Sequence, residues 1–384
     1  MTKELTEKII RGAIMATIFI AMIIVQGVAE RQANQVVFML AMIAIFSLFL
    51  KNIWATLFVM WTVFLYAFFK FSCGNVYLTN ILFAAMLYLF TKKCFKKEHI
   101  GMYLNAFLWF VFANLAYGVL QKAGFDFIFN TYLWDNVMKV KAPSEFSGFM
   151  GAQSIHAMLL SLSVPILASR GSKLGWVAAV MMLIPLYICT TSLCLIAGMG
   201  GLLIVLFFRV RKLVFCMILS ILIMFGVFYT QKVDNLGTER FVQWHRSMSD
   251  YMKHPITGWG LDSFANMTPF KDFKYMQTIA ERENYENDGV VYEKVTSIMW
   301  WDNPHNLIVT ILYEFGFIGF LIFFMYHRNI VLKFFRSAKT NNTIALAGFV
   351  ALFLLLSMGH FPIHLARIAP IIVCFYALLE VQLG

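Results

Sequence analysis

The residues best suited to catalysis in this 384-residue sequence surround a polar segment in its second half. Near the end of that segment, Asn303-Pro304-His305-Asn306 stands directly before an apolar stretch. Asn303 predicts a helix N-cap and Pro304 the first helical residue, so His305 is expected in the first helical turn. The positive end of a helix disfavours an imidazolium and favours a bound anion. A neutral histidine beside an anion site is suited to act as a general base.

Earlier in the polar segment, Thr238 is expected to cap a helix on which Arg240 and Trp244, four residues apart, share a face. An arginine presents a planar fork that binds phosphate oxygens in pairs, although a surface salt bridge with Glu239 or Asp250 would equally explain this one.

The next part of the segment, 254–260, reads His-Pro-Ile-Thr-Gly-Trp-Gly. Its proline and two glycines predict a tight turn that brings backbone close to something else. Gly258 and Gly260 would then shape a site, and His254 is either a loop residue or a substrate contact.

Two further groups of polar residues could join such a site. Glu314 would lie roughly 13 Å deeper than His305 on a continuous helix, with Gly316 and Gly319 within about 40° of the histidine face. A carboxylate inside a membrane needs a partner or a wet cavity. Spacings of four and three place His360, His364 and Arg367 on one helix face, where they either line the same cavity or extend harmlessly to the interface.

The elements that position these residues are membrane helices. Hydrophobic residues make up 60% of the sequence and charged residues 13%, with 40 Phe, 23 Met and 15 Tyr, whereas soluble domains are roughly 45–50% apolar and about 25% charged. This composition excludes a soluble enzyme, a nucleic-acid-binding module and a disordered protein. It predicts an all-α, polytopic protein whose surroundings are a lipid bilayer.

The apolar stretches predict about twelve spans within a single transmembrane domain, 1–384. They are 9–28, 34–50, 53–70, 76–91, 101–120, 149–168, 174–191, 193–208, 213–230, 305–326, 343–359 and 363–381. Residues 231–303 hold 8 basic and 11 acidic residues, and the rest holds 23 basic and 9 acidic. The basic residues outside this segment cluster mostly in short loops on the N-terminal side. The positive-inside rule therefore predicts cytoplasmic termini and a large extracytoplasmic loop, 231–304.

Three motifs in order resemble the superfamily of O-antigen ligases and polymerases. They are Glu-Arg-x3-Trp at 239–244, His-Pro-x2-Gly-x-Gly-x3-Phe at 254–264, and Pro-His-Asn-x7-Glu-x-Gly-x2-Gly at 304–319. The resemblance spans roughly residues 145 to 325. It departs from the family at Thr190-Thr191-Ser192, where Leu193 stands in place of an arginine that family members often carry.

The resemblance implies a membrane-embedded, inverting glycosyltransferase of the GT-C type, without metal or cofactor, in the bacterial inner membrane. Its donor would be a glycan on undecaprenyl diphosphate at the outer face, and its acceptor a glycan or a lipid A core. Arg240 matches the diphosphate clamp and His305 the base, with Asn306, Glu314, His254, Gly258 and Gly260 around the substrates. The His360, His364 and Arg367 group would replace the missing arginine.

Two other classes of function stay open. A multi-span transporter would show internal repeats and ionisable residues at mid-depth, whereas the polar residues here gather at one face. A non-catalytic component of envelope glycan assembly is the third class. Convergence of Arg240 and His305 on one outward-facing site would separate the enzyme from the transporter.

Overall fold

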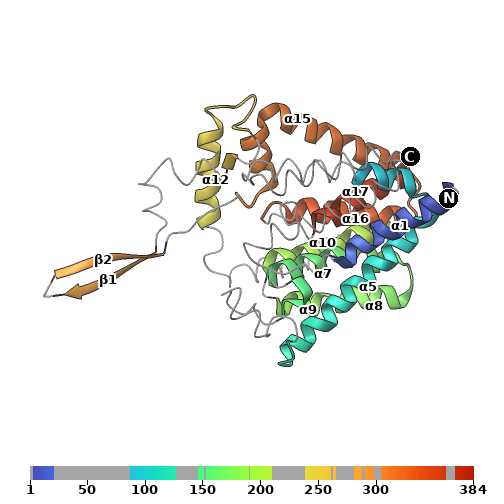
Figure 1. Ribbon diagram of the computed structural model, residues 1–384, viewed down its shortest axis with the longest axis horizontal. Helices are drawn as coiled ribbons and strands as arrows, with labels where there is room; N and C mark the ends of the chain where they lie inside the picture. The colour runs from blue at the N-terminus through green and yellow to red at the C-terminus, as the bar shows by residue number, and fades with distance from the viewer. Residues whose placement is uncertain are drawn as a thin grey trace, which may run out of the picture. The chain divides into compact units, whose positions relative to one another are not determined.

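The computed structural model describes residues 3–20, 87–126, 146–150, 153–189, 191–209, 238–260, 263–264, 281–287, 290–297, 304–359 and 368–384. The described chain is predominantly helical, as predicted (Figure 1). It divides into two compact units: unit 1 is Met1–Asp234 with Arg328–Gly384, and unit 2 is Asn235–His327. The predicted spans 34–50, 53–70 and 213–230 lie outside the described residues.

Most of the described helices belong to unit 1. They are α1 (Lys3–Ile20), α5 (Lys97–Lys122), the short 3-10 helix η1 (Gly148–Met150), α7 (Gln153–Ser169), α8 (Lys173–Met181), α9 (Leu183–Ile188), α10 (Ser192–Arg209), α16 (Asn341–Leu356) and α17 (Ala369–Leu383). Residues 87–94 are also helical. Helix α15 (Leu307–Arg336) begins in unit 2 and ends in unit 1.

Three described helices, α5, α10 and α15, are long and apolar enough to cross a membrane. The apolar helices α7, α16 and α17 are shorter. The predicted span 174–191 divides into α8 and α9 at Met182. Pro185 explains this division, because a proline supplies no backbone N–H to the preceding turn.

Helix α7 is the centre of unit 1. It packs against α5, α8, α10 and α16, and nearly all of its residues are buried. Glycines on two neighbours allow close approach to Pro165: a Cβ at Gly201 on α10 would lie 3.0 Å from its Cδ, and one at Gly348 on α16 would lie 2.7 Å from its Cβ. Such small-residue contacts let apolar helices pack tightly in a bilayer.

Aromatic rings join α5, α16 and α17 on another side of the unit 1 core. Phe349 and Phe375 stack with centroids 3.6 Å apart, and Phe107 meets Phe375 edge to face at 5.1 Å. All three rings are buried. The many phenylalanines in the sequence therefore include interior contacts as well as lipid-facing surface.

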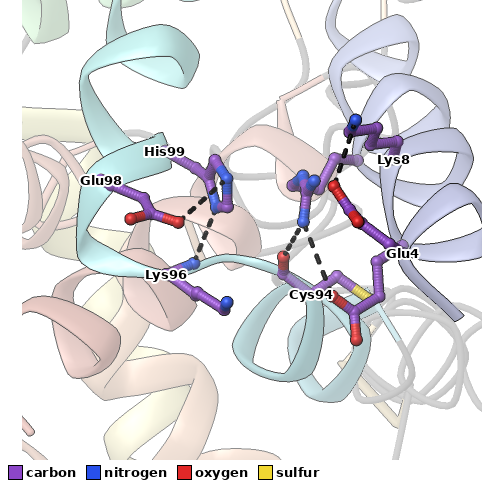
Figure 2. A network of polar contacts seen from close by, with 8 residues as sticks. Glu4, Lys8, Cys94, Lys96, Glu98 and His99 are labelled. Carbon is purple, nitrogen blue, oxygen red and sulfur yellow. Dashed lines mark hydrogen bonds and ion pairs between the residues drawn. The ribbon is translucent and has the colours of Figure 1, made fainter.

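Polar contacts tie several helix ends together at one end of unit 1. Arg11 on α1 donates to the carbonyl oxygen of Cys94 at 3.0 Å, close to His99, whose Nδ1 accepts from the backbone N–H of Lys96 (Figure 2). Lys92 pairs with Glu380 at 2.7 Å. The start of α1 and the end of α17 lie at this end (Figure 1). Helix ends predicted to be cytoplasmic are thus neighbours, while the side of the membrane stays a prediction.

Unit 2 contains α12 (Thr238–Tyr251), the first part of α15 and an antiparallel hairpin of β1 (Glu281–Asn287) and β2 (Val290–Ser297). The hairpin adds two strands to a chain predicted to be all-α. Its sequence explains it, because β-branched residues recur in β2 and Asp-Gly, which favours two-residue hairpin turns, joins the strands.

Candidate functional site

Helix α15 starts three residues later than predicted. Its N-cap is Asn306, whose Oδ1 accepts the backbone N–H groups of Ile308 at 3.0 Å and Val309 at 3.2 Å. The prediction that Asn303 caps the helix and that His305 lies in its first turn is therefore wrong. Asparagine is a favourable N-cap residue at either position. The hydrogen bonds from the second and third helical residues, Ile308 and Val309, fix the helix start at Asn306. Asn306 thus has a structural role, and its contact with substrate stays a prediction.

His305 lies just outside the helix in a strained conformation. Its φ is +50°, and among the described non-glycine residues only Phe146, at +73°, also has a positive φ. The left-handed region costs an ordinary residue about 1–2 kcal/mol. The side chain is half-buried, with Nδ1 removed from solvent. A glycine would adopt this conformation without strain, so the histidine side chain makes this position less stable than it could be.

Helix α12 is fastened to the residue before His305. The indole Nε1–H of Trp244 donates to the carbonyl oxygen of Pro304 at 2.7 Å. Arg240 lies one turn before Trp244 on the same helix, about 6 Å along its axis. The side chain of Arg240 lies outside the described part of the chain. The backbone nevertheless places the two predicted catalytic residues on segments that Trp244 joins.

Helix α15 is interrupted at Gly316, where φ is 67° and ψ is −169°. The turn 254–260 packs against this break through four backbone hydrogen bonds. The N–H groups of Trp259 and Gly260 donate to the carbonyls of Tyr313 and Glu314 at 2.8 and 3.0 Å. In return, the N–H groups of Phe317 and Ile318 donate to Pro255 and Ile256 at 2.9 and 3.3 Å.

These four bonds replace two helical ones. In an unbroken helix, Phe317 and Ile318 would donate to Tyr313 and Glu314. Here both donors and both acceptors find partners in the turn instead. A break in an apolar helix is tolerated only where its freed backbone groups are satisfied again. The His-Pro-x2-Gly-x-Gly motif and the Glu-x-Gly motif are thus two halves of one backbone contact.

Two glycines make this contact possible. A Cβ on Gly258 would lie 2.6 Å from the backbone of Glu314, and a Cβ on Gly316 would lie 2.3 Å from the carbonyl oxygen of Ile256. Both have positive φ, as does Gly260, whose Cβ would meet open space. The predicted turn and its close approach are confirmed. The prediction that Gly316 and Gly319 lie close to the His305 face of one helix is wrong, because His305 precedes the helix and the helix is interrupted at Gly316.

Aromatic residues pack against the turn 254–260. Trp259 donates through Nε1 to the carbonyl oxygen of Asp250 at 2.9 Å and stacks on Tyr313 at 6.4 Å. Tyr313 packs in turn with buried Tyr251 and Phe264. His254 is exposed, and its ring meets that of Trp259 at 4.1 Å. His254 and Trp259 therefore have structural contacts that account for their residue types.

Of the remaining predicted site residues, the structure describes some and not others. Glu314 is buried, with 4% of its surface exposed, in the last turn before the break. Asp250, considered above as a partner of Arg240, pairs with Arg246 at 3.5 Å and Lys253 at 2.8 Å. His360, His364 and Arg367 lie outside the described residues. Within the described residues, no group of three His, Cys, Asp or Glu side chains could hold a metal ion.

Sequence reasoning missed two features of this site. The bond from Trp244 to Pro304 joins residues 60 positions apart, and no local pattern signals it. The backbone hydrogen bonds between the turn 254–260 and the break at Gly316 also join distant parts of the sequence. The glycines in both motifs indicate such a close approach of two backbones, but not which segments meet.

An apolar, helical chain with three described helices long enough to cross a membrane, one of them broken at Gly316, is that of an integral membrane protein. Its residues 155–324 match the sequence model of the O-antigen ligase family. The match covers somewhat less than half of the chain and confirms the resemblance inferred from the motifs. Neither a curated protein nor a solved structure matches the chain significantly. This likeness points to a role in surface polysaccharide assembly.

Proposed function

We propose that this protein transfers or polymerises an oligosaccharide carried on undecaprenyl diphosphate, at the outer face of the bacterial inner membrane. The observation that carries the proposal is the Trp244 to Pro304 bond at 2.7 Å. It holds the helix that carries Arg240 against the strained segment that carries His305. The family match over 155–324 contains both residues.

The chemistry needs one base and one site for developing negative charge. His305 takes the proton of an acceptor hydroxyl, whose oxygen attacks the anomeric carbon of the donor sugar. The bond from that carbon to the diphosphate oxygen breaks, and the lipid diphosphate leaves as an anion. Arg240 binds this anion with its planar fork. A single displacement inverts the anomeric centre.

The position of His305 fits this role. Asn306 caps α15, so the positive end of that helix begins one residue after the histidine. That end favours a bound diphosphate beside the histidine. The acceptor is a glycan for a polymerase or a lipid A core for a ligase.

The test is an assay of purified protein in liposomes with a synthetic undecaprenyl-diphosphate oligosaccharide. Release of undecaprenyl diphosphate together with an extended glycan supports the proposal. Movement of the intact donor between leaflets, with its sugar–phosphate bond unbroken, would instead identify a transporter. An added chelator should leave the rate unchanged.

Glycan profiling of a deletion strain separates the two reactions. Surface glycan capped by single repeat units identifies a polymerase. Loss of all attached glycan, with long lipid-linked chains accumulating, identifies a ligase. We favour the polymerase slightly, because Leu193 stands after Ser192 where members of the family often carry an arginine.

A further inference from the structure

A group of basic residues of unit 1 lies where α7, α10 and α16 meet. Arg209, the last residue of α10, donates to the backbone carbonyl of Ser169 at 3.3 Å and to Oδ1 of Asn341. Asn341, the first residue of α16, donates to the carbonyl oxygen of Arg170 at 3.4 Å. The guanidinium of Arg170 donates to Oδ1 of Asn105. Arg170, Lys173 and Arg209 are called the basic cluster below.

Among the residues that the structure describes, no carboxylate pairs with either arginine of this cluster. Their hydrogen-bond acceptors are amide and carbonyl oxygens, which carry no net charge. The acidic residues in the described part of unit 1 all contact other groups; they are Glu4, Glu7, Glu98, Asp126 and Glu380. Burial lowers the pKa of Arg170, with no opposing contribution from an acid. Arg170 is partly buried while Arg209 is exposed, so a bound anion would offset the cost of holding the Arg170 charge out of water and stay reachable from the outside.

An exposed apolar stripe starts directly beside the cluster. After Lys173, helix α8 presents Leu174, Val177 and Met181 to the outside, with 78%, 57% and 55% of their surfaces exposed. Their spacing of three and four residues puts them on one helix face. A cationic group at the end of apolar helices, followed by an aliphatic stripe, matches an amphiphile with an anionic head and an acyl tail.

We propose that the basic cluster and the adjoining face of α8 bind an anionic phospholipid, with its phosphodiester on Arg170 and Arg209 and an acyl chain along Leu174, Val177 and Met181. Arg209 supplies a fork for two phosphate oxygens. The turn at Gly171, with φ of +73° and no side chain, leaves the headgroup access: even a Cβ there would lie 3.6 Å from Nη1 of Arg209.

Thermal unfolding of the full-length protein in detergent tests this site, with three probes titrated separately. Dioleoyl phosphatidylglycerol is expected to raise the melting temperature in a saturable way. Dioleoyl phosphatidylcholine and inorganic phosphate are expected to give much smaller shifts. An equal shift from phosphatidylcholine would overturn the charge requirement, and an equal shift from inorganic phosphate would overturn the acyl contact.

Variants locate the effect. The pair Arg170→Gln and Arg209→Gln should weaken phosphatidylglycerol binding at least tenfold, whereas Lys8→Gln with Lys97→Gln, which removes the same charge from exposed sites, should not. Arg209 also holds Ser169, so the pair Arg170→Lys and Arg209→Lys is measured beside them. Retention of most of the shift in the lysine pair supports the proposal. Equal loss in the lysine and glutamine pairs, or an undiminished shift in the glutamine pair, overturns it.

Discussion

His305 is the residue at which strain and proposed chemistry coincide. Its φ of +50° is costly for any residue with a side chain. We expect His305→Gly to raise the free energy of unfolding by about 1 kcal/mol, since glycine adopts this conformation freely. The same change should lower glycosyl transfer by roughly 10²–10⁴-fold, because it removes the base.

His305→Ala is the companion variant, since it loses the base and keeps the strain. It should match His305→Gly in activity but not in stability. Calorimetry in detergent and release of undecaprenyl diphosphate measure the two quantities. Near-normal turnover in either variant would contradict the role of His305.

Arg240 allows a different residue-level test. Arg240→Lys keeps the charge but replaces a planar fork with a point charge, so we expect at least a tenfold loss of kcat/KM. Arg246→Lys is the matched control on the same helix, because Arg246 already pairs with Asp250 at 3.5 Å. Equal rates for the two lysine variants would show that Arg240 does not bind the diphosphate as a fork.

The sequence predicts which residues form the candidate site, but it does not predict where helix α15 starts or the backbone conformation of His305. Arg240 and Trp244 do lie on one helix, and 254–260 does form a close-packed turn. The start of α15 was misplaced because two asparagines compete for the cap. The φ of His305 follows from the outcome of that competition, which depends on tertiary contacts such as the bond from Trp244.

At the scale of elements, the contact between the turn and the break in α15 should be the least tolerant part of unit 2. Gly316→Ala and Gly258→Ala place a Cβ 2.3 and 2.6 Å from backbone atoms. We expect each to cost on the order of 3 kcal/mol or more. Gly260→Ala, which meets open space, should cost only about 1–2 kcal/mol of conformational strain.

Melting temperatures measured in one detergent rank the stabilities of these three glycine variants. Gly101→Ala on α5, with nothing within 4 Å and an ordinary φ, is the neutral reference. If Gly316→Ala proved no less stable than Gly260→Ala, the exchange of backbone bonds would not hold the two motifs together.

The hydrogen bond that joins α12 to Pro304 can be tested separately from the stability of the fold. Trp244→Phe keeps an aromatic ring and removes the bond to Pro304, which should cost about 1 kcal/mol. Trp259→Phe removes a similar bond, to Asp250 at 2.9 Å, from a place not attached to residues 304–306. We expect Trp244→Phe to lose at least ten times more activity than Trp259→Phe at similar stability. Equal losses would mean that the bond serves only the fold.

At the scale of the whole molecule, composition predicts a helical membrane protein well because it sums over hundreds of residues. Predicted spans overlap each of the described apolar helices, yet their ends shift by several residues and one divides at Met182. The hairpin was missed because a charged stretch within a polar segment gives weak strand signals. Such details depend on contacts distant in the sequence, which composition does not contain.

The sidedness of the molecule follows from charge and can be measured. Helix ends rich in lysine and arginine gather at one end of unit 1, where Lys92 meets Glu380 and Gln382 meets Thr340 at 3.3 Å. The positive-inside rule predicts that this end faces the cytoplasm. In a variant whose six cysteines are replaced by serine, a cysteine at exposed Thr257 should react with an impermeant maleimide in intact cells. A cysteine at exposed Lys97 should react only after permeabilisation. The opposite pattern would put the turn 254–260 in the cytoplasm, away from donors that await transfer on the outer face, and would overturn the proposed reaction with the orientation.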